Sequence, residues 1–174
     1  MAKEKIDSLH GMFEHDLKDI FFAEQQLIKS LDKMEKEAKI PEIKEAFAQH
    51  KAETKGQVER LKEVFRMMGE SPKAQKCPGI LGIIKEKEEF NKEVSKGKDG
   101  KELLDLYNLG AASKVERYEI SAYEGLINIA QKHDMTDVIP LLAANLEEER
   151  AALTKVQDLA LNFDTADIKS GMAY

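Results

Sequence analysis

Two glutamates lie on helical stripes where apolar residues would be expected. In residues 6–39, apolar side chains recur at helical spacing, and Glu24 falls on their stripe. In residues 101–132, Glu119 takes the same kind of position. A buried carboxylate is costly unless it is protonated, pairs with a basic side chain or coordinates a metal ion. For either glutamate alone, a lysine or arginine partner would be a sufficient explanation.

The acids do not occur singly, and this favours a metal. His50 and Glu53 are three residues apart and share a helix face, as do Glu116 and Glu119, and a Glu triplet spans 147–149. Four helices that each offer a carboxylate at a similar level are typical of a dimetal carboxylate site. The expected metal ligands are Glu24, His50, Glu53, Glu116, Glu119, Glu148 and Glu149.

The ligand pattern departs from the usual pair of Glu-x-x-His motifs, because Gly56 follows Glu53 at that spacing. His50 instead precedes Glu53, so it is predicted either to bind a metal or to orient a carboxylate. Glu148 and Glu149 differ by about 100° around a helix axis, so only one should point fully inward. Alignment of the two halves of the chain, described below, favours Glu148 as the inward residue, whereas the positions of the apolar residues on the same helix favour Glu149. Tyr107, Tyr118 and Tyr123 flank the site, where they could support redox chemistry, although packing is their expected role.

Helical stripes and breaks predict the elements that position these residues. We expect long helices over 6–39, 41–68, 101–132 and 137–162, and a short one over 80–94. Short turns make each pair of long helices an antiparallel hairpin, and a long crossover holds the short helix. The prediction is an all-α, ferritin-like four-helix bundle over 1–162 with a tail over 163–174.

The two hairpins align as a repeat at an offset of 95 residues. This offset places Glu24 on Glu119 and Glu53 on Glu148. Core positions coincide too, although few residues are identical. The alignment therefore indicates a shared architecture more than a duplication.

Composition excludes several classes of function. The 174 residues carry a net charge of -6 and no basic run interleaved with aromatics, which argues against nucleic-acid binding. No apolar run approaches the roughly 20 residues that span a bilayer. The single cysteine, Cys77, excludes an intrachain disulfide and favours a cytoplasmic location. Cys77 is expected to be either a small buried residue or an exposed thiol.

The chain resembles a known family in its motifs around the acids. The segments AEQQL (23–27), HKAETKGQVERL (50–61), KVERYEI (114–120) and LEEE (146–149) resemble those of the YciF/YciE-like bacterial stress proteins. The resemblance covers about residues 8–160. It implies a ferritin-like, rubrerythrin-related fold, a link to general and osmotic stress, and a dimetal centre at the acids named above. Where close relatives have a further acid, this chain has Leu153.

Three functions follow as hypotheses. The first is a stress-response protein that binds two metal ions, Fe or Mn, and reacts with a small oxidant such as peroxide or oxygen. The second is a non-enzymatic bundle that acts through structure or partner binding, which Leu153 and the missing motifs favour. The third is iron storage in a cage, although no fifth C-terminal helix is evident. The family resemblance favours a homodimer.

Overall fold

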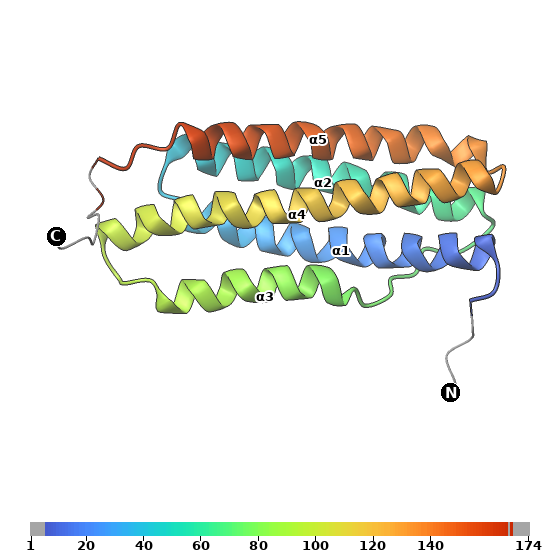
Figure 1. The fold of residues 1–174 in the computed structure, drawn as a ribbon, viewed down its shortest axis with the longest axis horizontal. Helices are drawn as coiled ribbons and strands as arrows, with labels where there is room; N and C mark the ends of the chain where they lie inside the picture. Colours follow the sequence, from blue (N-terminus) through green and yellow to red (C-terminus); the bar gives the residue numbers. More distant parts are fainter. Residues whose placement is uncertain (1–5, 167, 169–174) are drawn as a thin grey trace.

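Four long helices lie side by side and a fifth, shorter helix flanks them (Figure 1). The computed structural model describes residues 6–166 and 168. The elements within them are α1 (Leu9–Glu37), α2 (Pro41–Met67), α3 (Pro78–Glu93), α4 (Lys98–Lys132), the 3-10 helix η1 (Thr136–Val138) and α5 (Ile139–Leu161).

The helices pair as two hairpins. α1 packs on α2 and α4 packs on α5, and the hairpins meet through contacts of α1 with α4 and of α2 with α5. α3 belongs to the crossover and packs against α4 and α1, outside the bundle. The expected all-α bundle of two hairpins with an extra crossover helix is confirmed.

Local capping explains where several helices begin and end. The Ser8 hydroxyl accepts a 3.1 Å hydrogen bond from the Gly11 amide, so α1 begins later than residue 6. Pro78 fills the first turn of α3, and the Cys77 thiol accepts from the Ile80 amide at 3.5 Å. α3 therefore begins two residues earlier than the apolar pattern indicates. Gly69 follows α2 with a φ of 75°, a left-handed conformation that suits glycine.

The core consists of two apolar clusters with a polar layer between them. The larger cluster includes Phe13, Leu17, Leu61, Phe65, Leu126 and Leu142. The smaller cluster, at the other end of the bundle, includes Leu31, Met34, Ile43, Phe47, Leu109 and Val156. Buried polar side chains separate them on α2, where His50, Thr54 and Gln57 intervene, and on α5, where Glu149 does. The bundle thus buries a band of polar groups in mid-length.

A buried aspartate ties the α1–α2 turn to α4. The Asp105 carboxylate accepts hydrogen bonds from the Lys39 amide at 3.0 Å and from the Ile40 amide at 2.9 Å. These amides precede α2, whose first residue is Pro41. Asp105 therefore positions the start of the helix that carries His50.

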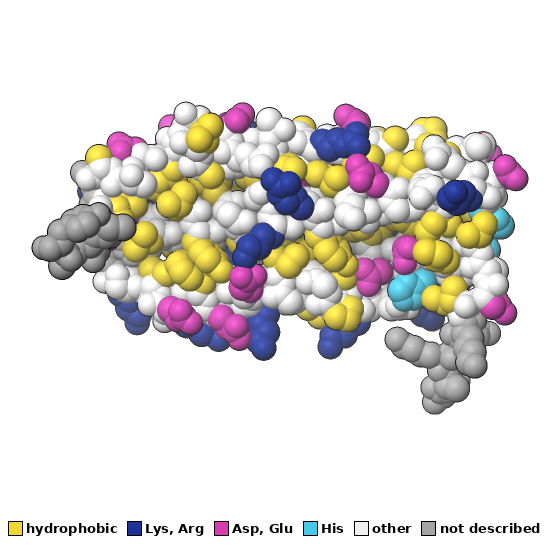
Figure 2. Space-filling view, in the orientation of Figure 1, with side chains coloured by type: hydrophobic (Ala, Val, Ile, Leu, Met, Phe, Trp, Pro, Cys, Tyr) yellow, Lys and Arg dark blue, Asp and Glu magenta, His cyan; other side chains and the backbone are white. Residues whose placement is uncertain are grey.

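The outer surface mixes charges of both signs. Figure 2 shows Lys, Arg, Asp and Glu side chains interspersed over α1, α3 and α4, with apolar side chains in the seams between helices. Among the described residues, none of the helices is both long and apolar enough to cross a membrane. Most of the expected C-terminal tail, residues 167 and 169–174, lies outside the described residues, and Phe163 packs against the smaller cluster.

Replacing Asp105 by alanine should destabilise the fold. It removes the acceptor of two backbone amides and leaves a buried void, and we expect a loss of about 2 kcal/mol in the free energy of unfolding. Urea unfolding followed by circular dichroism measures this. The exposed Asp158 on α5 provides the control, because Asp158→Ala should change the midpoint little. Equal effects of the two variants would contradict the role given to Asp105.

Candidate metal centre

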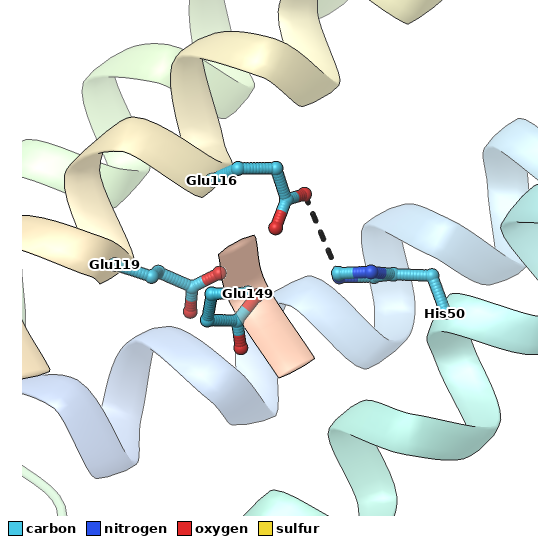
Figure 3. Close-up of side chains that lie close together, drawn as sticks. All are labelled: His50, Glu116, Glu119 and Glu149. Atoms are coloured by element: carbon cyan, nitrogen blue, oxygen red, sulfur yellow. Dashed lines mark ion pairs between the residues drawn. The ribbon is translucent and has the colours of Figure 1, made fainter. Parts of the chain in front are cut away.

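Four side chains from three helices converge in the polar layer. They are His50 of α2, Glu116 and Glu119 of α4, and Glu149 of α5, and all four are buried. Each offers one ligand atom, and these atoms all lie within 4.8 Å of one another. Figure 3 shows the three carboxylates turned toward one another, with the His50 ring facing Glu116. One or two cations could contact all four.

Helical spacing explains the convergence. Glu116 and Glu119 are three residues apart on α4 and therefore share its inner face. On α2, Thr54 follows His50 by one turn, and its hydroxyl donates a 2.8 Å hydrogen bond to the His50 carbonyl. On α5, Glu149 lies one turn after Asn145, and both are buried. Each helix presents its polar groups at the level where the apolar clusters stop.

Glu24 of α1 lies close enough to this group for its charge and the charges of Glu119 and Glu149 to act on one another, and a hydrogen-bonded relay holds it. The Tyr123 hydroxyl donates to Glu24 Oε1. Asn145 Nδ2 donates to the Tyr123 hydroxyl at 2.8 Å and contacts the Gln57 carbonyl at 3.4 Å. Glu24, Tyr123, Gln57 and Asn145 are fully buried. Glu24 is thus held in one orientation, and its Oε2 atom has no hydrogen-bond partner among the described residues.

Arg60 closes the relay toward the surface. Its Nε donates to Asn145 Oδ1, and its Nη2 forms an ion pair with Glu148. Glu148 is half-buried, whereas Glu149 is fully buried within the converged group. Of the two candidate α5 ligands, Glu149 therefore points inward, whereas Glu148 pairs with the Arg60 guanidinium.

Burial dominates the electrostatics of the four glutamates. Loss of hydration raises the pKa of Glu24, Glu116 and Glu119 well above the usual range, and negative neighbours add to the effect. Burial likewise raises the pKa of Glu149 to about 7. For Glu24, the hydrogen bond from Tyr123 and the charge of Arg60 lower the pKa and partly offset these effects. Carboxylates this close together cannot all stay ionised unless a cation neutralises them, so some of them must otherwise bind protons.

Several carboxylate oxygens of these glutamates also lack hydrogen-bond partners. Within residues 6–166 and 168, both oxygens of Glu119 and of Glu149 and one oxygen each of Glu24 and Glu116 are buried without a hydrogen-bond partner. Buried polar atoms normally have partners, and each exception requires an explanation. Oxygen donors with one imidazole match the preferences of hard and borderline divalent ions. The donor set therefore fits a metal centre.

His50 is in the protonation state that a ligand requires. Burial lowers its pKa to about 4, so the imidazole is neutral at pH 7. Its Nε2 atom lies 3.6 Å from Glu116 Oε1, a contact that becomes ionic only in acid. A neutral imidazole has a free nitrogen lone pair with which to bind a cation.

A cavity of about 270 Å³ reaches the group between α2 and α5. His50 and Glu116 line it beside Glu53, Gln49 and Lys155, and several alanines form its walls. Glu53 is half-buried, and it accepts a 2.9 Å hydrogen bond from Gln49 Nε2. Glu53 thus lies at the cavity and outside the set whose ligand atoms converge.

The structure brings together five of the seven expected ligands. Glu116, Glu119, His50 and Glu149 converge, and Glu24 is near enough for its charge to act on Glu116 and Glu119. Metal binding by any of them remains a prediction.

Sequence reasoning did not identify the relay. Packing was the expected role of Tyr123, yet its hydroxyl donates a hydrogen bond to Glu24. Asn145 and Gln57 were not singled out. Asn145 could have been found, because it shares the inward phase of Leu142, Leu146 and Glu149 on α5.

The pKa of Glu149 predicts how stability without metal depends on pH. Its pKa is about 7 in the folded protein, against an ordinary value of 4.5. Below pH 4.5 the residue is protonated in both states. As pH rises toward 7, only the unfolded chain ionises, so this contribution to stability is lost. At about 1.4 kcal/mol per pKa unit, wild type should lose about 3 kcal/mol relative to Glu149→Gln.

Chemical denaturation in EDTA at pH 5 and pH 7.5 measures most of that difference, about 2 kcal/mol. His50 acts in the opposite direction, because its lowered pKa costs stability as pH falls from 6.5 toward 4. Comparing variants at each pH cancels this contribution. Glu147→Gln, an exposed substitution on the same helix, should leave the pH dependence unchanged. A pH-independent difference between wild type and Glu149→Gln would refute the assignment.

Comparison with known proteins places the chain in a family. Residues 8–167 match the profile of DUF892, described as a domain of unknown function. Protein YciF of Escherichia coli (strain K12) is 34% identical over 156 residues, which make up 89% of this chain and 92% of that protein.

Solved structures agree in fold. The crystal structure of the Escherichia coli stress protein YciF superposes with a TM-score of 0.81 at 32% identity, covering 90% of this chain and 97% of that one. YcfI from Rhodopseudomonas palustris, described with a proposed structural role, gives a TM-score of 0.85 at 36% identity, covering 90% and 98%. The resemblance to YciF seen in the motifs is confirmed, and the chain belongs to the DUF892 family.

Proposed function

We propose that this protein binds two divalent metal ions, iron or manganese, in the polar layer of a ferritin-like bundle. The observation that carries the proposal is the set of six buried carboxylate oxygens without partners around one neutral imidazole. A layer of four ionised glutamates without a cation would be strongly destabilising. Two divalent ions would balance four carboxylates in charge.

The residues take distinct roles in this proposal. Glu119 and Glu149, whose oxygens are both buried without a hydrogen-bond partner among the described residues, would hold the ions at the centre of the layer. Glu116 and His50 would bind on the side of the cavity, and Glu24 would bind through Oε2 while Tyr123 holds its other oxygen. When bound, such a pair of ions supplies two electrons to a small oxidant such as peroxide or oxygen. The relative YciF is named a stress protein, and we propose a stress-related role here too.

A second function is favoured by the raised pKa values of the glutamates. If Glu24, Glu116 and Glu119 keep their protons at neutral pH, the layer carries little charge and the bundle is stable without metal. The protein would then act through its structure or through a partner. The relative YcfI has a description that agrees with this alternative.

Metal content distinguishes the two functions. Protein from cells supplied with iron and manganese should contain about two equivalents per chain, measured by mass spectrometry of the metals. The double variant Glu119→Gln, Glu149→Gln should contain almost none, whereas Glu147→Gln should match wild type. Added metal should raise the unfolding temperature of wild type and of Glu147→Gln, by mass action, and leave that of the double variant unchanged.

The alternative predicts a different result from the same proteins. Wild type would be free of metal, and the double variant would be more stable than wild type because it buries neutral amides in place of acids. A metal-free wild type under these conditions would end the metal proposal.

We also propose that the protein forms a homodimer through the end of the bundle where α1 begins and α2 ends. Exposed apolar side chains gather there, namely Ile6, Leu9, Met12 and Met67. Light scattering should give twice the chain mass of 19.7 kDa. Met12→Lys should halve the measured mass, whereas Leu161→Lys, exposed at the other end, should not. A monomeric wild type would contradict the dimer.

A further inference from the structure

The converged ligands are closed to solvent on two sides. Between α1 and α4, Ile83 and Ile84 of α3 cover the group and leave a gap of only about 20 Å³. Beside Glu24, the relay residues Tyr123 and Asn145 are fully buried. The gap on the α3 side is too small for an ion that carries its water.

The third side is open. The cavity between α2 and α5 has a volume of about 270 Å³ and reaches His50 and Glu116. At about 30 Å³ of liquid per water molecule, it has room for on the order of nine waters. Ala46, Ala112, Ala151 and Ala152 line it, and their small side chains keep it wide. A divalent ion could reach the first ligands before it loses its hydration shell.

Charged groups at the cavity have opposite effects on a cation. Glu53 is half-buried, lies one helical turn after His50 and attracts a cation toward it. Its negative charge also acts on Glu116 and Glu149, which places it electrically close to the converged group. Lys155 of α5 is exposed on the lining and repels a cation.

We propose that this cavity is the route by which divalent cations reach the centre, and that Glu53 receives the ion from solvent and passes it to His50 and Glu116. This inference rests on the proposed metal-binding function. It assigns Glu53 a transient contact, in place of the permanent ligand role that its sequence position suggests.

Rates of cobalt uptake test the route. Metal-free protein is mixed with Co(II) in a stopped-flow instrument, and the visible absorbance of the bound ion gives the rate and the final stoichiometry. Glu53→Gln should slow uptake by about three- to tenfold, and added salt should reduce this difference. Lys155→Gln should accelerate uptake by about twofold. Both variants should bind as much cobalt at saturation as wild type.

A substitution that narrows the cavity provides a second test of the route. Ala151 is exposed and lines the cavity, so Ala151→Phe narrows the route without filling the core. It should slow uptake by about tenfold or more. Ala144→Phe, also exposed on α5 and outside the cavity lining, should leave the rate unchanged. The unfolding temperature of each variant confirms that it is folded.

Each alternative result has one meaning. Wild-type rates in Ala151→Phe and Glu53→Gln, with full cobalt stoichiometry, would overturn the route and leave the metal centre intact. A reduced stoichiometry in Glu53→Gln would make Glu53 a permanent ligand and overturn its transient role. If wild type binds no cobalt at all, both the proposed function and the route fall.

Discussion

The structure depends on one electrostatic constraint, which is the burial of four glutamates in a single layer of the bundle. Removing a carboxylate from water costs several kcal/mol unless protons or cations replace the lost hydration. Glu24, Glu116, Glu119 and Glu149 come from three helices, and no arginine or lysine lies among the converged ligands. The apolar clusters on either side must supply the stability that the layer does not. This arrangement is costly as architecture alone, and under the proposed function a bound cation would make it favourable.

The polar layer is asymmetric, because its Glu24 side is held by hydrogen bonds and its His50 side is open to a cavity. On the side of Glu24, Tyr123, Asn145 and Arg60 form a continuous chain of hydrogen bonds that holds one carboxylate in a fixed orientation. On the side of His50, alanines leave space, and the half-buried Glu53 lines the cavity. One side of the layer is thus preorganised and the other is accessible. A site that must both position ions tightly and admit them from solvent needs these two properties in different places.

Periodicity in the sequence was sufficient to predict the helices and the inward direction of Glu24, Glu119 and Glu116. It predicted that Glu148 and Glu149 could not both point inward, but the choice depended on how α5 rotates against α2. That rotation follows from tertiary contacts such as the Arg60–Glu148 ion pair, which joins residues 88 positions apart. The relay through Tyr123 could not be predicted from the sequence for the same reason, because its residues come from α1, α4, α5 and α2. Asp105 was missed because an acid on a helix surface and an acid that receives amides from a distant turn have the same local pattern.

The division of the core has a consequence for cooperativity. Two apolar clusters with a polar layer between them are coupled in part through that layer, and the strength of this coupling depends on what the layer contains. With ions bridging α2, α4 and α5, the two ends of the bundle would be linked by bonds and would open together. With protons alone, the end formed by Leu31, Phe47 and Val156 is held by fewer apolar contacts and would open first. The occupancy of the layer would then decide whether the bundle behaves as one cooperative unit or as two.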